Sequence, residues 1–149
     1  MSFSCRYLAT YVSDLEAAEA FYTSVFDLGL LFRESRQDDE SWHTLRDDLG
    51  WDEIYRRGIH VDMVALERDE FVLALLEGRP REGTLYEICV AVEAPEVEAT
   101  RGRLPDHVVV EEFAPGWLRF IDPFGFRWAV RDRDVPFRSS GEIAERWIS

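Results

Sequence analysis

At 149 residues the chain has the length of one domain, and its 46% hydrophobic content is enough for a packed core, which argues against wholesale disorder. A formal charge of -13 would repel the phosphates of nucleic acids and anionic membrane surfaces, so we expect neither as a partner. No run approaches the roughly 20 apolar residues that span a bilayer, and no basic segment leads into an apolar run at the N-terminus, so we expect a cytoplasmic protein.

The chain begins with a pattern typical of a strand followed by a helix. Residues 6–12 are rich in Tyr, Leu and Val and predict a strand. From Asp14 to Phe26 apolar residues recur every three or four positions, which predicts an amphipathic helix with Ser13 as its N-cap. Residues 28–34 predict a second strand.

An insertion precedes the next two strands. Apolar residues at near-helical spacing predict an inserted helix over about residues 41–57, which ends near Gly58. Two β-type runs follow at residues 61–66 and 71–76. Residues 78–83 contain Gly and Pro and predict a linker.

The same order of elements then starts again. The predicted elements are a strand at 85–92, a helix at 94–104, a strand at 108–112, and a hairpin of strands at 117–121 and 126–130. Asp122–Gly125 have the composition of a type I turn, and residues 139–148 predict a capped terminal helix.

Strand, helix and three further strands therefore occur twice, about 80 residues apart, as in an internal duplication. Three consecutive strands leave no room for crossover helices, which excludes a doubly wound parallel sheet. We therefore expect an α+β fold in which two βαβββ modules, residues 5–77 and 84–131, form a cupped mixed sheet. Residues 132–149 form a tail, and the whole chain, residues 1–149, is predicted to be a single domain.

Three segments resemble a known superfamily. They are YLATYVSDLEAAEAFYTSVFDLGL at Tyr7–Leu30, EICVAVEAPEVEA at Glu87–Ala99 and FIDPFGFRWAV at Phe120–Val130. Their order and spacing resemble the vicinal oxygen chelate proteins, which include glyoxalase, extradiol dioxygenases and bleomycin resistance proteins. The resemblance implies the same cupped fold and a homodimer.

Two positions depart from that pattern. Asp27 stands where the family usually has Gly after the first helix, so we expect the helix to end at Gly29 instead. Phe126 replaces the Asn that commonly follows the Asp-Pro-x-Gly turn.

The resemblance also implies where a metal would be held. Metal-dependent members take His or Glu ligands from the first and last strand of each module, and these positions correspond here to Tyr7, Ala74, Glu87 and Ala129. Two of the four lack a donor atom. Shifting the alignment by two residues, which keeps the same strand face, does not recover a ligand set. We therefore expect a metal-free member with no cofactor.

Other metal-ligand residue types lie elsewhere. The histidines are His43, His60 and His107, and none occupies a family ligand position. His60 and Asp62, two apart on one strand, are the alternative candidate pair. Cys5 and Cys89 are expected to be reduced thiols in apolar surroundings.

Strand alternation predicts which side chains face the concave side of the sheet. They are Tyr7, Tyr11, Leu76, Glu87, Cys89, Trp117, Arg119, Arg127 and Arg131. Aromatic faces and the Glu87 carboxylate suit a flat or cationic ligand, and the arginines suit a carboxylate or phosphate. A simpler interpretation is that Glu87 forms an ion pair with one of these arginines.

Two functions agree with these observations. The first is binding of an aromatic or charged small molecule without chemistry, as in bleomycin resistance proteins, for sequestration of a drug or metabolite. The second is a glyoxalase-like or dioxygenase-like lyase, isomerase or oxidoreductase with an atypical site, in which Glu87 is the only candidate catalytic residue, as a general base. We favour binding. The high acidity of the chain is also explained by a salt-rich habitat or by attraction of a cationic ligand.

Overall fold

The computed structural model describes residues 3–78, 81, 83–121 and 127–149. Contacts divide the chain into two compact units. The α3 unit, named after helix α3 (Ala94–Arg103), contains residues 1–9 and 84–136, and the α1 unit, named after helix α1 (Leu15–Phe26), contains residues 10–83 and 137–149. The predicted turn at Asp122–Gly125 and the departure at Phe126 lie outside the described residues.

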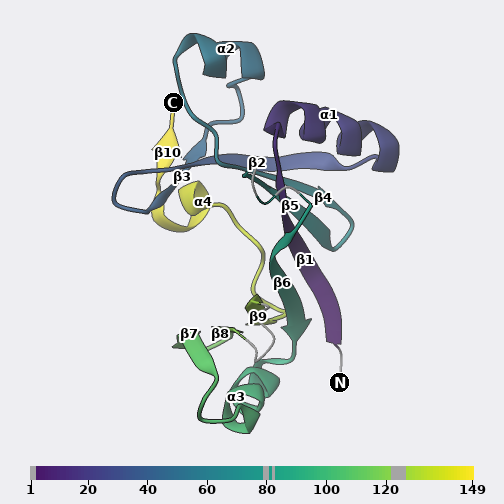
Figure 1. The fold of residues 1–149 in the computed structure, drawn as a ribbon, viewed down its shortest axis with the longest axis vertical. Helices are drawn as coiled ribbons and strands as arrows, with labels where there is room; N and C mark the ends of the chain where they lie inside the picture. The colour runs from purple at the N-terminus through teal and green to yellow at the C-terminus, as the bar shows by residue number, and fades with distance from the viewer. Residues whose placement is uncertain (1–2, 79–80, 82, 122–126) are drawn as a thin grey trace. The chain divides into compact units, whose positions relative to one another are not determined.

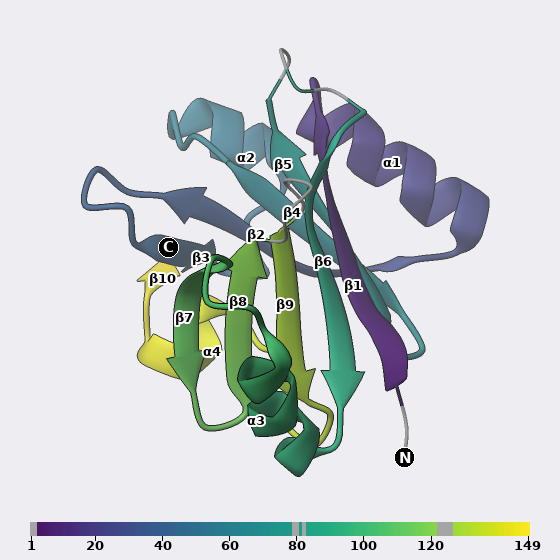
Figure 2. The ribbon, with the colours of Figure 1, turned by 60° about the horizontal axis from the view of Figure 1, so that its bottom comes forward.

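The α3 unit is a sheet covered by one helix. Its strands are residues 3–9 of β1 (Phe3–Val12), β6 (Leu85–Val92), β7 (Val109–Ala114), β8 (Trp117–Ile121) and β9 (Arg127–Asp132), in the order β1-β6-β9-β8-β7. Strands β6 and β9 are parallel, whereas β8 is antiparallel to both β7 and β9. Figure 2 shows α3 lying across one face of β8 and β9.

Alternation along these strands separates an apolar face from a polar one. Val90, Leu118 and Val130 face α3 and form a core with Val97 of that helix. Because side chains alternate, the intervening residues of β6, β8 and β9 lie on the opposite face. In the register Cys89 pairs with Ala129 and Ala129 pairs with Arg119, so these three positions share that second face. The sheet therefore presents one side to its helix and the other to a candidate site.

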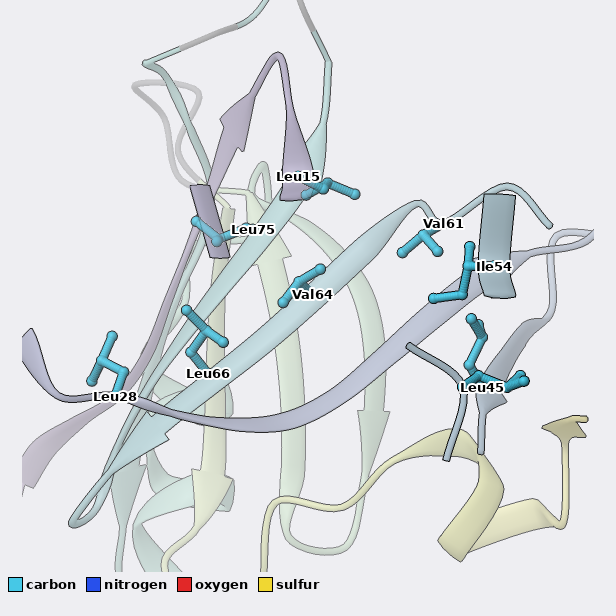
Figure 3. Close-up of a cluster of buried hydrophobic side chains, with 9 residues drawn as sticks. Leu15, Leu28, Leu45, Ile54, Val61, Val64, Leu66 and Leu75 are labelled. Carbon is cyan, nitrogen blue, oxygen red and sulfur yellow. The ribbon is translucent and has the colours of Figure 1, made fainter. Parts of the chain in front are cut away.

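The α1 unit is a second sheet with helices α1, α2 (Trp51–Arg56) and α4 (Ser140–Ala144). Its strands are β2 (Gly29–Arg36), β3 (Trp42–Leu45), β4 (Met63–Arg68), β5 (Phe71–Glu77) and β10 (Trp147–Ile148), in the order β10-β3-β2-β4-β5. Helix α1 packs on β2, β4 and β5 (Figure 1). Nine buried side chains from α1, α2, the strands and the segments that connect them form one core, and Figure 3 labels eight of these.

The prediction of one inserted helix over residues 41–57 was wrong. Residues 42–45 form strand β3, which pairs with β2 through Glu34 opposite Thr44, and only residues 51–56 are helical. Leu45, Leu49 and Ile54 are all buried in one core, although they do not belong to one helix. Their near-helical spacing therefore indicated burial and not a continuous helix. Pairing with β2 on one side and β10 on the other overrides helical propensity at this point.

The predicted terminal helix is shorter than residues 139–148. Ser139 caps it as expected, accepting a hydrogen bond from Glu142 N, but α4 ends at Ala144 and β10 follows in parallel with β3. A left-handed backbone at Glu145, with φ 57°, ends the helix and turns the chain into β10.

The ends of α1 also differ from expectation. Asp14, not Ser13, is the N-cap, and its carboxylate accepts a hydrogen bond from Ala17 N. The helix ends before Asp27, which itself adopts the left-handed conformation (φ 54°, ψ 41°) that glycine usually supplies, so the helix does not extend to Gly29.

Both βαβββ repeats predicted from the sequence are present, the first with β3 and α2 inserted, and the fold is α+β. None of the helices formed by the described residues has both the length and the apolar content needed to cross a bilayer.

Candidate functional site

The candidate site lies on the face of the α3 unit opposite α3 and is centred on Glu87 of β6. Glu87 is only 3% exposed. Its Oε1 accepts a hydrogen bond from the Tyr7 hydroxyl, and its Oε2 lies 2.7 Å from Arg119 Nε. Burial raises the pKa of Glu87 above its ordinary value, and the positive charge of Arg119 only partly offsets this effect. Glu87 is thus a buried carboxylate held by a phenol and a guanidinium.

Arg119 links this buried carboxylate to the surface. Its Nη1 donates to Glu112 Oε1 at 2.8 Å, and Trp117 Nε1 donates to Glu112 Oε2 at 2.6 Å. Burial disfavours the charged guanidinium, but the carboxylates of Glu87 and Glu112 outweigh it and raise the pKa of Arg119. Tyr7, Glu87, Arg119, Glu112 and Trp117 therefore form one continuous polar network across four strands.

Two further arginines extend this face. The Cζ atom of Arg131 lies 5.6 Å from the Trp117 ring and that of Arg119 lies 5.1 Å from it, so two guanidinium groups contact one indole. Arg127 instead binds Glu111, with Nε 2.7 Å from Oε1, and lies 4.9 Å from the Tyr86 ring. The hydrogen bonds from Arg127 lower the pKa of Glu111.

Solved structures share this arrangement of strands. The chain matches a hypothetical protein from Bacillus halodurans C-125 with a TM-score of 0.54 and 13% identity, over 93% of this chain and 100% of that one. It matches the Mn(II)-bound glyoxalase from Novosphingobium aromaticivorans with a TM-score of 0.53 and 17% identity, over 91% of this chain but 40% of that one. It matches a methylmalonyl-CoA epimerase in complex with methylmalonyl-CoA and NH4+ with a TM-score of 0.50 and 12% identity, over 93% and 100%.

The fold is that of the vicinal oxygen chelate superfamily. At these identities the similarity establishes the fold and leaves the activity open. No protein-family model matches the sequence, and no curated protein matches it.

The residues at the four metal-ligand positions of this superfamily do not fit a divalent ion. Ala129 lies beside Cys89 and Arg119 in the sheet and, like Ala74 of β5, has no donor atom. Glu87 could bind an ion only by giving up Arg119, whose own positive charge opposes a cation at that point. Among the described residues, no group of three or more His, Cys, Asp or Glu side chains is placed to hold a metal.

Cys89 does not supply the missing ligand. Its side chain is fully buried, and burial raises the pKa of its thiol to about 12, so the thiolate that binds metals is strongly disfavoured. Cys5 is exposed, and both cysteines are free thiols.

The structure brings together some of the predicted ligand-binding residues. Tyr7, Glu87, Trp117 and Arg119 share one network, whereas Arg127 is engaged with Glu111. The other two predicted residues belong to the α1 unit. There, the Tyr11 hydroxyl accepts a hydrogen bond from Arg81, and Leu76 is buried in β5 opposite Met63 of β4.

Sequence reasoning missed Glu111 and Glu112, which hold Arg127 and Arg119. A register shift between Val110 and Glu112 lets two consecutive glutamates both serve this face. Simple alternation would have assigned only one of them. The signal available in the sequence was a pair of adjacent glutamates on a strand predicted to lie in the same sheet as three arginines.

The alternative pair of His60 and Asp62 is present in the α1 unit. His60 Nε2 lies 3.2 Å from Asp62 Oδ1 and 3.6 Å from Glu77 Oε2. His43 lies elsewhere in that unit, where its Nε2 is 3.0 Å from Ser41 Oγ.

Proposed function

We propose that this chain is a metal-free small-molecule-binding protein with the vicinal oxygen chelate fold, used for sequestration of a drug or metabolite. The observation that supports this function is the state of Glu87. It is the only carboxylate at the four ligand positions, and Tyr7 and Arg119 already occupy its two oxygens. A carboxylate held in this way positions Arg119, whose guanidinium lies beside the Trp117 ring, and this arrangement suits recognition rather than metal binding.

The proposed ligand is a flat aromatic molecule with polar substituents. Trp117 is half-buried and offers an aromatic surface for a ligand ring. A pair of stacked aromatic rings contributes about 0.5–1.5 kcal/mol beyond the area that it buries. Among the described residues, the carboxylates of Glu87, Glu111 and Glu112 equal in number the guanidinium groups of Arg119, Arg127 and Arg131, so these six side chains together favour neither an anion nor a cation. Stacking and hydrogen bonds would therefore supply the specificity.

An atypical glyoxalase-like or dioxygenase-like enzyme is the second candidate. The raised pKa of Glu87 supports it, because a general base works best when its pKa lies near the operating pH. The burial of Glu87 argues against it, since a carboxylate that is only 3% exposed and contacts Tyr7 and Arg119 is poorly accessible to a substrate proton.

Metal content separates the two candidates. Protein produced without an affinity tag, in medium supplied with Ni, Fe, Mn and Zn, would be measured by elemental analysis. We expect well under one metal ion per chain. Stoichiometric metal that is lost with chelator and restores an activity would favour the enzyme.

A thermal-shift screen of flat heteroaromatic compounds tests binding directly, because a ligand that binds only the folded state raises the unfolding temperature. Trp117→Ala should abolish the shift produced by a hit. Trp42→Ala is the matched control, because Trp42 also lies beside an arginine, Arg36, but in the α1 unit. Equal loss in both variants would contradict a site at Trp117.

Glu87→Gln tests the network behind the site. We expect weaker binding of the same hit, because Arg119 loses its buried counter-charge and keeps Glu112 as its remaining carboxylate partner. Unchanged affinity in this variant would remove Glu87 from the proposed role.

A further inference from the structure

The α1 unit contains a cavity of about 480 Å³ between the beginning of α1 and helix α2. Its volume lies within the range of roughly 300–1,000 Å³ that is typical of small-molecule sites. The charged and aromatic side chains that line it are Asp14, Glu16, Trp51, Tyr55, His60 and Glu77. Leu15 of α1, Ile54 of α2 and residues of the segments before α1 and after α2 also line it.

The charges around this cavity are predominantly negative. Three carboxylates line it, and no arginine does among the described residues. His60 Nε2 lies 3.6 Å from Glu77 Oε2, and this imidazole is the one basic side chain among the described lining residues. A cavity with this lining attracts positive charge and repels anions.

The N-terminus of α1 does not reverse this preference. Helix N-termini attract anions through their free amide groups. Here the Asp14 carboxylate accepts a hydrogen bond from Ala17 N at 3.0 Å, so the chain supplies its own anion. Glu16 adds a second carboxylate in the first turn. An external anion would meet both carboxylates.

The aromatic side chains are held in place around the cavity. The ring centroids of Trp51 and Tyr55 are 5.8 Å apart, and the Tyr55 hydroxyl donates to Glu16 Oε1 at 2.9 Å. Trp51 Nε1 donates to Glu19 Oε2 at 3.1 Å, and the Arg33 guanidinium lies 4.9 Å from the Trp51 ring. These contacts fix the two rings, which offer an apolar surface beside the carboxylates of the cavity.

We propose that this cavity binds a small organic cation, an ammonium group carried on a flat apolar body. The ammonium group lies between Glu16 and Glu77, and the apolar body contacts Trp51 and Tyr55. This site is separate from the Trp117 face of the α3 unit, and its residues include none from that face.

Three probes of similar size but different charge test the charge preference by isothermal titration calorimetry. Phenethylammonium should bind, 2-phenylethanol should bind at least several-fold more weakly, and phenylacetate should show no binding. Raising the salt concentration should weaken the binding of phenethylammonium and leave the binding of 2-phenylethanol unchanged. No binding of phenethylammonium, or equal binding of the neutral alcohol, would overturn the proposal.

Charge-removing variants test the location. Glu77→Gln and Glu16→Gln should each weaken phenethylammonium several-fold, and two variants are made in case one folds poorly. Glu67→Gln is the control, because it removes the same charge from an exposed position of β4 outside the cavity. The Trp51 indole signal in a nitrogen–proton NMR spectrum should shift on titration. If Glu67→Gln weakens the cation as much as Glu77→Gln does, or the Trp51 signal stays fixed, the cavity is not the site.

Discussion

Glu87 is buried, and its two carboxylate oxygens contact Tyr7 and Arg119. Its burial and these contacts both affect the stability of the fold. An isolated buried carboxylate is very costly, and the positive charge of Arg119 offsets part of that cost. Burial nevertheless remains the larger effect and raises the pKa of Glu87. The residue is therefore retained at a cost to folding, which is common for groups that serve a site.

This cost predicts a pH dependence. Because the pKa of Glu87 is higher in the folded than in the unfolded chain, the unfolded chain ionises first as the pH rises above the ordinary glutamate value of 4.5. The contribution of Glu87 to the free energy of unfolding should fall across the window up to the raised pKa and stay constant above it. Urea unfolding at a series of pH values should show wild type losing stability relative to Glu87→Gln in that window. A constant difference between the two proteins would contradict the assignment.

The two cysteines should differ in reactivity. Cys89 is fully buried with a thiol pKa of about 12, whereas Cys5 is exposed. A chromogenic thiol reagent should therefore label one thiol per native chain and two after denaturation. In Cys5→Ser the native chain should not react. Rapid labelling of two thiols in the native protein would show that β6 opens easily.

At the scale of elements, a buried polar network joins β2, β3 and α4. Glu34 is 3% exposed, and its Oε2 accepts from Thr44 Oγ1 at 2.6 Å and from Ser140 N at 2.7 Å. Thr44 Oγ1 in turn accepts from Gly141 N at 2.7 Å. The first turn of α4 is thus bound to the edge of the sheet through side chains of two strands. These contacts explain why the C-terminal segment folds against an insertion almost 100 residues earlier in the chain.

Removing one hydroxyl from this network should be costly. Thr44→Val keeps the shape of the side chain but leaves Gly141 N without its partner and removes one of the two hydrogen bonds to Glu34 Oε2, and unsatisfied buried groups cost about 1–3 kcal/mol. Urea unfolding should show a loss of this size. Thr100→Val is the control, because the hydroxyl of Thr100 bonds within α3, where it donates to Glu96 O and accepts from Arg103 Nη2. Equal losses in the two variants would contradict the role of the network.

For the whole molecule, net charge sets how stability responds to salt. The formal charge of -13 implies that like charges repel one another, and folding increases this repulsion because it brings the charges closer together. Raising NaCl from about 0.01 M to about 1 M shortens the Debye length from about 30 Å to about 3 Å and should raise the unfolding temperature. Differential scanning calorimetry checks this. A falling unfolding temperature would mean that ion pairs such as Arg33–Glu19 outweigh the repulsion.

Much of the architecture was predictable because its signals are local. The run of β-type residues at 85–92 and the short connections between later strands were enough to predict the second βαβββ repeat. Residues 42–45 could not be assigned in this way, since their extended conformation depends on pairing with β2 and β10.

The candidate site was likewise predictable only where its signals are local. The sequence alone determined that Glu87, Arg119 and Trp117 share a sheet face and that Ala74 and Ala129 lack donors, because strand parity and side-chain chemistry need no long-range information. Only the tertiary structure decided that Arg119 pairs with Glu87 while Arg127 pairs with Glu111. Arginine side chains are long, and their choice among carboxylates depends on strand register and on the bulge in β7, which are set by pairing between distant segments.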